Sequence, residues 1–151
     1  MAMKFKSARG LDLALKATSR AIRVEVRREL QRGALRIEAT AAESIIEQTP
    51  GGKVYPSKGR KGAVHAASPA GSPPNADTGR LHTSITTATV ADTAERIAVE
   101  TGTNVPYGTW LEFGTSKMEP RPFMGPAFDQ HVASTQDRIR EAVRRGARKI
   151  K

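Results

Sequence analysis

Residues 107–129 read Tyr-Gly-Thr-Trp-Leu-Glu-Phe-Gly-Thr-Ser-Lys-Met-Glu-Pro-Arg-Pro-Phe-Met-Gly-Pro-Ala-Phe-Asp, and they hold the only Trp and three of the four Phe. Each aromatic side chain can bury roughly 150–250 Å², so this segment offers the largest apolar groups to a core. Gly114 is expected to end a short helix in the left-handed conformation, and the three prolines that follow keep the chain extended. The sequence therefore predicts a short helix and a proline-stiffened hook that carries Phe123 and Phe128 into the core.

The aromatic hook is expected to be structural. Glu112 is the best candidate for a functional carboxylate, but a general base needs a second catalytic group within hydrogen-bond reach, and the sequence offers none. Its expected role is an ion pair with Arg121 or hydrogen bonds to the turn at 114–116. The residues assigned to the hook are Tyr107, Trp110, Glu112, Phe113, Gly114, Arg121, Pro122, Phe123 and Pro126.

A small sheet is predicted before the hook. Residues 84–90 are rich in β-branched side chains, which is typical of a strand. Residues 96–101 alternate polar and apolar side chains and predict a returning strand with Ile97 and Val99 on one face. Because an isolated hairpin is only marginally stable, a further strand is expected from residues 117–123 or from the segment before the sheet.

Two helices flank this centre. Apolar residues recur at steps of three or four from Ile22 to Ile45, which predicts a helix over 10–49 that ends before Pro50. Gly33 weakens this helix by about 1 kcal/mol relative to Ala and marks a close crossing or a bend. Residues 129–151 also follow helical spacing, with Thr135 and Gly146 as weak positions. The predicted fold class is α+β, with a long N-terminal helix, a small antiparallel sheet and a C-terminal helix packed on the sheet.

The chain of 151 residues is expected to be a single domain, 1–151. Residues 1–9 are short, basic and expected to be frayed. Residues 50–79 contain 6 Gly and 5 Pro, a composition that cannot build its own core, and they are interpreted as a mobile basic arm or a passive linker. Residues 80–128 hold the sheet and the hook, and 129–151 form a basic C-terminal helix.

Charge is unevenly distributed along the chain, whose formal net charge is +10. Residues 63–135 carry 4 basic and 7 acidic side chains, whereas residues 136–151 carry 7 basic and 2 acidic ones. The basic flanks are either a solvated surface or a contact surface for a polyanionic partner, which could be nucleic acid or an acidic protein ring. The basic residues considered for such contacts are Arg28, Arg32, Arg36, Lys53, Lys58, Arg60, Lys61, Arg140, Arg144 and Arg148.

Several kinds of chemistry are not expected. The chain has no cysteine, and none of its three histidines has neighbours at metal-ligand spacing, so no metal site, cofactor or catalytic group is predicted. No apolar run approaches the roughly 20 residues of a membrane span, and the N-terminus lacks the apolar core of a signal peptide. We therefore expect a protein that is not an enzyme, is made in a cytoplasm and has no membrane partner.

Two motifs carry a resemblance to a known family. The first runs Tyr107-x-x-x-Leu-Glu-Phe-Gly-Thr-Ser-Lys-Met-x-x-Arg-Pro-Phe-x-x-Pro-Ala127, and the second runs Ser68-Pro-x-x-x-Pro-Pro-x-x-Asp-Thr-Gly-Arg-Leu-x-x-Ser-Ile85. In this order and spacing they resemble tail-completion (head–tail joining) proteins of long-tailed, lambda-like phages, a family often labelled a tail component. Pro120 and Gly125 depart from the residues that are usual in the family.

The resemblance implies a structural virion protein of the head–tail connector. It would form a ring at the head-proximal end of a phage tail, with a hexamer as one size to consider, and would be assembled in the cytoplasm of a bacterial host. Its partners would be other copies of itself, head-closure proteins and tail-terminator or tube proteins. DNA would pass through the lumen of the ring without sequence-specific contacts.

The alternative is a non-specific DNA-binding module that uses the basic arm and the C-terminal helix. Nothing in the sequence resembles a helix-turn-helix or a zinc finger, and the acidic centre argues against a surface that reads a groove. Any binding to DNA should therefore weaken steeply with salt, because it would rest on the release of condensed counterions. A hydrolase is a third and weaker hypothesis, because no catalytic constellation is found.

Overall fold

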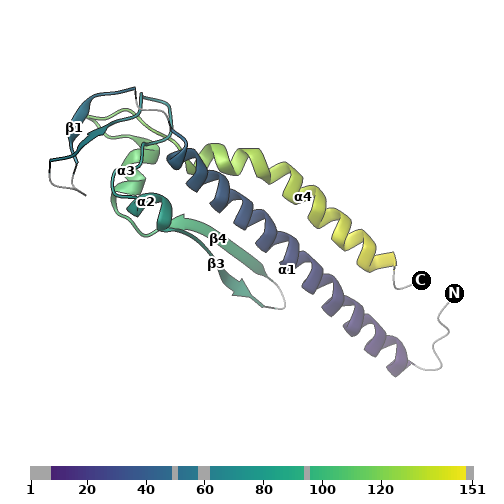
Figure 1. The fold of residues 1–151 in the computed structure, drawn as a ribbon. Helices are drawn as coiled ribbons and strands as arrows, with labels where there is room; N and C mark the ends of the chain where they lie inside the picture. Colours follow the sequence, from purple (N-terminus) through teal and green to yellow (C-terminus); the bar gives the residue numbers. More distant parts are fainter. Residues whose placement is uncertain (1–7, 49–50, 58–61, 94–95, 149–151) are drawn as a thin grey trace.

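The computed structural model describes residues 8–48, 51–57, 62–93 and 96–148, with side chains from Ser19 onward. Two long helices, α1 (Ala8–Ile46) and α4 (Met124–Arg148), run antiparallel and side by side (Figure 1). The N-terminal end of α1 and the C-terminal end of α4 lie at the same end of the molecule. Most of the remaining elements gather at the other end of α1, and one hairpin extends back along the helix as far as Arg23. The molecule is therefore elongated, with a helical stem and a mixed α/β head.

Glycine and threonine allow α1 and α4 to approach closely. A Cβ added at Gly33 would overlap Cγ2 of Thr135, and one added at Gly146 would overlap Cγ1 of Ile22. Of the two alternatives for Gly33, a close crossing or a bend, the structure shows the close crossing. Thr135 and Gly146 are contact positions of α4, where small residues let the two helices meet.

This crossing gives a prediction for Gly33→Ala. Alanine favours a helix over glycine by about 1 kcal/mol, but its Cβ would clash with Thr135, whose β-branched side chain is stiff in a helix. We expect a net loss of about 1–3 kcal/mol of stability, the usual cost of overpacking, measured by denaturant unfolding. Gly102→Ala is the control, because no heavy atom lies within 4 Å of the point that its Cβ would occupy. An unchanged or higher stability for Gly33→Ala would contradict the prediction.

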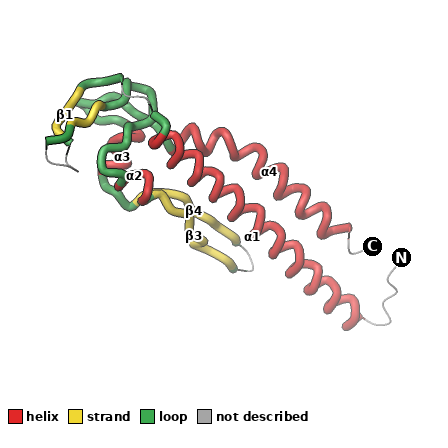
Figure 2. The backbone as a smooth tube through the Cα atoms, viewed as in Figure 1, coloured by secondary structure: helices red, strands yellow, loops and turns green. Residues whose placement is uncertain are grey.

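The second sheet of the chain is a two-stranded hairpin that packs on α1 (Figure 2). It consists of β3 (Ile85–Asp92) and β4 (Ile97–Thr103), paired antiparallel with one register shift near the tip. The hydroxyl groups of Thr87 and Thr101 lie 3.0 Å apart, and Thr101 donates to the carbonyl oxygen of Ala34 at 3.3 Å. Hydrogen bonds from threonines on the side of the hairpin that faces α1 therefore hold the hairpin against the helix.

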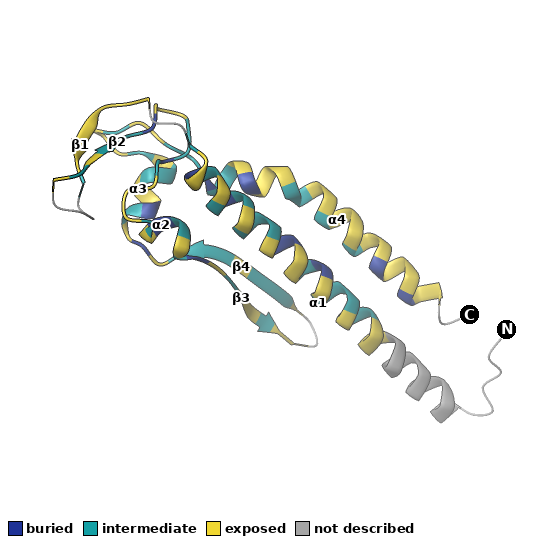
Figure 3. Cartoon of the chain, in the orientation of Figure 1, coloured by how far each residue is buried: buried dark blue, intermediate teal, exposed yellow. Residues whose placement is uncertain are grey.

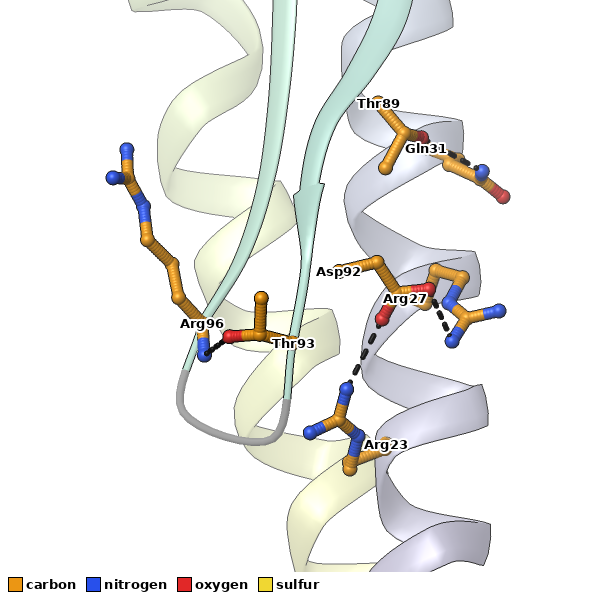
Figure 4. Close-up of polar contacts among 7 residues, drawn as sticks. All are labelled: Arg23, Arg27, Gln31, Thr89, Asp92, Thr93 and Arg96. Carbon is orange, nitrogen blue, oxygen red and sulfur yellow. Dashed lines mark hydrogen bonds and ion pairs between the residues drawn. The ribbon is translucent and has the colours of Figure 1, made fainter.

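Ion pairs tie the tip of this hairpin to α1 (Figure 4). The guanidinium groups of Arg23 and Arg27 lie 3.1 and 2.5 Å from the carboxylate of Asp92. One turn further along α1, Nε2 of Gln31 donates to the hydroxyl of Thr89 at 3.3 Å. These groups are partly exposed, so each pair contributes no more than about 1 kcal/mol, and their main effect is to fix the direction of the hairpin.

Residues 50–79 contain a hairpin that their composition did not predict. It is formed by β1 (Val54–Pro56) and β2 (Val64–Ala66) and is followed by the short helix α2 (Arg80–Thr83). The segment also contacts the hook, because the N–H of Gly71 donates to the carbonyl oxygen of Pro120 at 2.9 Å. Its described residues are therefore not a structureless linker, while the mobility expected for the arm stays a prediction.

The predicted α+β class is confirmed, with two differences in packing. The C-terminal helix packs along α1, whereas the expectation placed it on the sheet. Within the described residues, β1–β2 and β3–β4 remain separate two-stranded sheets, so the expected third strand of β3–β4 is not formed by residues 117–123 or by the arm. Because α1 covers β3–β4, the helix supplies the apolar surface that an isolated hairpin lacks.

The core lies in the head, where the end of α1 meets the start of α4. A cluster of buried residues lies there, and most of the outer surface of α4 is exposed (Figure 3). The buried cluster consists of Ala41, Ile45, Leu81, Ile85, Val105, Phe123 and Ala127. Phe123 is thus the one aromatic side chain of this cluster, and aliphatic residues make up the rest of it.

Candidate interaction surfaces

Glu112 connects α3 (Tyr107–Phe113) to the start of α4. Its Oε2 accepts hydrogen bonds from the N–H groups of Phe123 at 2.8 Å and Met124 at 3.0 Å, and its Oε1 accepts one from Gly125 at 2.8 Å. A carboxylate that accepts hydrogen bonds from the free N–H groups at a helix N-terminus also interacts favourably with the positive end of the helix dipole. The expected pairing of Glu112 with Arg121 is therefore wrong, and so are the expected hydrogen bonds to the 114–116 turn.

Arg121 instead links the hook to the 50–79 segment. Its Nε donates to the carbonyl oxygen of Ser68 at 3.1 Å, and its backbone N–H donates to the carbonyl oxygen of Leu111 at 2.7 Å. Ser68 is fully buried. The first residue of the upstream motif therefore lies against the downstream motif, a pairing that no local pattern in the sequence could indicate.

Gly114 ends α3 in a conformation that differs from the expected left-handed one. Its φ of 75° is positive, as expected, but its ψ of −175° is extended. A Cβ at this position would lie 2.7 Å from the carbonyl oxygen of Met118. Glycine is required here both by the backbone angles and by the close return of the chain.

Most of the hook's large aromatic side chains face outward. Phe123 is 2% exposed, which confirms its place in the core, but Phe128 is 51% exposed and its expected burial is wrong. Trp110 and Phe113, both on α3, are 57% and 78% exposed. Tyr107 is partly buried against the core. The hook therefore inserts one aromatic ring and exposes three. Two of these, Trp110 and Phe113, lie three residues apart on α3 and so share one side of it; this pair is called the aromatic knob.

The two prolines assigned to the hook also differ in exposure. Pro122, next to Phe123, is partly buried, whereas Pro126 in the first turn of α4 is exposed. Pro126 has no N–H, so it removes one of the four donors that a helix N-terminus leaves without an internal partner. Together with the three bonds to Glu112, this accounts for the first donors of α4.

The antiparallel helix pair brings the two basic flanks together. The distal stem, defined as residues 19–36 of α1 and 136–148 of α4, carries six arginines from α1 and five from α4, against four carboxylates. Arg140 pairs with Asp137 at 2.8 Å, whereas Arg144 and Arg148 form no ion pair within the described part of the chain. The sequence separates these basic segments by about a hundred residues, and the fold places them side by side.

Two of the three α1 arginines considered for partner contacts, Arg28 and Arg32, form ion pairs within the helix. Arg28 lies 2.9 Å from Glu25, and Arg32 lies 2.9 Å from Glu29, each three residues away. Arg36 has no ion pair among the described residues and is partly buried. The ion pairs with Glu25 and Glu29 lower the repulsion between the arginines and reduce the need for an acidic partner on this side of α1.

A shallow hollow on the distal stem has mixed charge. It is lined by Glu29, Asp137, Arg138, Arg140, Glu141, Arg144 and Arg145. Three carboxylates among four guanidinium groups leave little net charge for a phosphate backbone to bind. The other basic candidates lie elsewhere: Lys53 is exposed beside β1, and Lys58, Arg60 and Lys61 lie outside the described residues.

The histidines do not form a ligand set in the described part of the chain. His131 Nε2 lies 2.7 Å from the hydroxyl of Thr40, where it bridges α4 and α1. His65 lies in β2 and His82 in α2. Within the described residues no group of three His, Asp or Glu side chains could hold a metal ion, and no described helix is long and apolar enough to cross a membrane.

Comparison with known proteins identifies the family. The family model HK97-gp10_like, described as “Bacteriophage HK97-gp10, putative tail-component”, matches residues 9–114, which is more than half of the chain and reaches from α1 to the end of α3. The Arg121–Ala127 part of the downstream motif lies beyond the matched residues. No curated protein and no solved structure matches the chain. The expected relationship to phage tail components is confirmed: the chain belongs to the HK97 gp10-like family.

Proposed function

We propose that the chain is a tail-completion component, which forms a ring at the head-proximal end of a phage tail and helps to join the tail to the filled head. The observation that supports this most is the aromatic knob, whose two side chains, Trp110 and Phe113, are 57% and 78% exposed. Aromatic residues are enriched at the centres of protein interfaces, where a few of them carry most of the binding energy. A surface of this kind suits assembly with other protein subunits.

The local structure prepares the knob for binding. Glu112 fixes α3 to the start of α4 through its three hydrogen bonds, and Arg121 holds the following segment against α3. Side chains on a segment that is already ordered lose less conformational entropy when they bind. The mechanism is therefore surface complementarity between subunits, and it needs no covalent chemistry and no cofactor.

The distal stem is the proposed contact with neighbours in the neck or with DNA in the lumen. Arg144 and Arg148, which have no ion pair among the described residues, would meet an acidic surface of a head-closure, tail-terminator or tube protein, or the phosphates of DNA. Arginine suits both partners, because its guanidinium group forms paired hydrogen bonds with carboxylates and with phosphates.

Non-specific DNA binding is the second candidate function. It is favoured by the convergence of eleven arginines on the distal stem, and disfavoured by the carboxylates that line the hollow. A fluorescent duplex of random sequence should then bind the purified protein with an affinity that falls steeply as salt increases. Affinity that depends on sequence at high salt would contradict the non-specific interpretation.

Native particles provide the test of the main proposal. Phage particles that encode this chain are purified, the chain is detected by mass spectrometry and by gold-labelled antibody, and its place is read from electron micrographs. We expect label at the neck in particles with joined heads and tails, and free heads with free tails when the gene is deleted. Label confined to the tail tip or to the capsid surface would contradict the proposal.

A charge reversal on the distal stem tests its contact role. Arg144→Glu with Arg148→Glu should reduce the yield of joined particles while leaving thermal stability nearly unchanged, because both side chains are exposed. Arg96→Glu with Lys117→Glu is the matched control: it changes the net charge equally, at exposed positions outside the stem. Equal yields from the two double variants would show that the distal stem is only a solvated surface.

A further inference from the structure

Glu29 is a buried carboxylate in the contact between α1 and α4. Ile22, Glu29 and Gly33 lie on one side of α1, because they follow one another at steps of seven and four residues. Ile22 and Gly33 contact α4 at Gly146 and Thr135, so Glu29 lies between two close contacts of the helices. Its side chain is 7% exposed. A position that faces a neighbouring helix in this way is usually apolar.

Only one oxygen of this carboxylate has a partner among the described residues. Oε1 of Glu29 accepts a hydrogen bond from Arg32 at 2.9 Å, whereas Oε2 is buried and has no hydrogen-bond partner there. A buried polar atom without a partner destabilises the folded state. The carboxylate is therefore unfavourable for the fold of a single subunit, and exceptions of this kind to the packing rules occur at functional sites.

Glu29 also lines the hollow of the distal stem, together with six residues of α4. Asp137, one of those six, is already paired with Arg140. The lining groups that form no ion pair within the described part of the chain are Arg138, Glu141, Arg144 and Arg145. The hollow thus offers a buried hydrogen-bond acceptor, Oε2 of Glu29, beside three guanidinium groups and one carboxylate that have no ion pair there.

This combination of groups fits a polypeptide better than the backbone of DNA. A phosphodiester has acceptor oxygens and no donor, so it would meet the guanidinium groups but would bring negative charge towards Glu29 and leave Oε2 without a partner. A lysine or arginine of a partner would be repelled by the guanidinium groups. A polypeptide segment with an amide or hydroxyl group beside a carboxylate satisfies both parts of the hollow: the N–H or O–H donates to Oε2, and the carboxylate accepts from the guanidinium groups.

We propose that the hollow of the distal stem docks such a segment of a neighbouring protein subunit, and that Glu29 selects this segment over DNA. The inference rests on the proposed function, in which the distal stem meets either a protein or DNA, and it assigns the hollow to the protein. Protein docking and DNA binding should then respond in opposite directions when Glu29 is removed. Docking loses an acceptor, whereas the phosphates of DNA lose a negative charge that repels them.

Glu29→Met tests the proposal, because methionine fills an irregular space without an acceptor oxygen or a charge. The variant is supplied to phage that lack the natural gene, and joined particles are counted in electron micrographs. We expect about a tenfold lower yield of joined particles, the effect of losing a central interface group. The melting temperature of the purified variant should be equal to or above that of the parent, and a fluorescent duplex of random sequence should bind it at least as tightly. Glu43→Met is the matched control, at an exposed position of α1 outside the distal stem.

Two further variants define the chemistry of the partner. Glu29→Gln keeps an oxygen that can accept a hydrogen bond, so its yield of joined particles should lie well above that of Glu29→Met. Equal losses for the two variants would indicate a cationic partner group and overturn the proposed chemistry. Arg138→Gln with Arg145→Gln changes only exposed side chains, so joining should fall at an unchanged melting temperature. If Glu29→Met melts below the parent, this double variant decides the inference.

The outcomes separate this inference from the proposed function. If the natural chain lies at the neck and Glu29→Met particles join at or above the parental yield, the hollow binds DNA or nothing. The inference is then overturned, while the proposed function stands. Normal joining by the double arginine variant overturns the inference as well. If the natural chain is absent from the neck, the proposed function fails, and the inference that rests on it fails too.

Discussion

Phe123→Ala is expected to lower the free energy of unfolding by about 3–5 kcal/mol, the usual loss when a buried aromatic ring is removed. Phe123 is 2% exposed and is the largest side chain among the fully buried ones that the structure describes. It contacts a cluster made of small and aliphatic residues, which cannot collapse far enough to fill the space of a phenyl ring. For a chain of this length, the melting temperature should fall by roughly 10 °C.

Two controls sharpen this prediction. Phe128→Ala removes the same side chain from a position that is 51% exposed, and Trp110→Ala removes a larger one that is 57% exposed. Both should cost about 1 kcal/mol or less, because most of the ring is already in contact with water. Denaturant unfolding of the three variants measures the difference. If Trp110→Ala were as destabilising as Phe123→Ala, the aromatic knob would belong to the core.

Hydrophobic patterning predicted much of the fold. Steps of three and four in α1 and α4, and alternation around Ile97 and Val99, follow from the periods of helix and strand, so the two helices and the β3–β4 hairpin were expected close to their observed bounds. The β1–β2 hairpin was missed, because Val54–Pro56 and Val64–Ala66 are short and lie among glycines and prolines. Its pairing depends on the register of two separated segments, which composition does not encode.

Burial of the aromatic residues was predicted less well than secondary structure. A concentration of Trp and Phe predicts a core when apolar area is the only criterion, but an interface uses the same residue types. The deciding information is which side of α3 faces Leu81 and Ile85, and that depends on tertiary packing.

Partners of polar side chains were also set by packing between distant segments. Arg121 was expected to pair with Glu112, but it bonds to the carbonyl oxygen of Ser68, which is 53 residues away in the chain. Similarly, Gly33 and Thr135 are each weak helix positions by local propensity, and their value becomes visible only when the two helices meet. Helix propensity evaluates each residue in isolation, whereas the role of Gly33 and Thr135 is the contact that they make between the two helices.

Glu112→Ala is expected to destabilise the protein by about 2–4 kcal/mol, since it removes a charged cap and three hydrogen bonds to a carboxylate. The first turn of α4 contains no acidic residue of its own, so Glu112 from α3 supplies the negative charge that favours the helix N-terminus. The loss should appear in denaturant unfolding. It should also appear as faster amide exchange at Phe123, Met124 and Gly125, whose N–H groups would lose their acceptors.

Glu112→Gln separates geometry from charge in this cap. Its side-chain oxygen can replace Oε2 and keep the bonds from Phe123 and Met124, but its NH₂ group then faces the N–H of Gly125, which needs an acceptor. We expect roughly half of the loss seen for Glu112→Ala. Glu119→Ala is the matched control, because it removes an exposed carboxylate from the same hook and should change stability by less than about 0.5 kcal/mol. If Glu112→Ala unfolded at the same denaturant concentration as Glu119→Ala, the fixed presentation of the aromatic knob would have to come from packing alone.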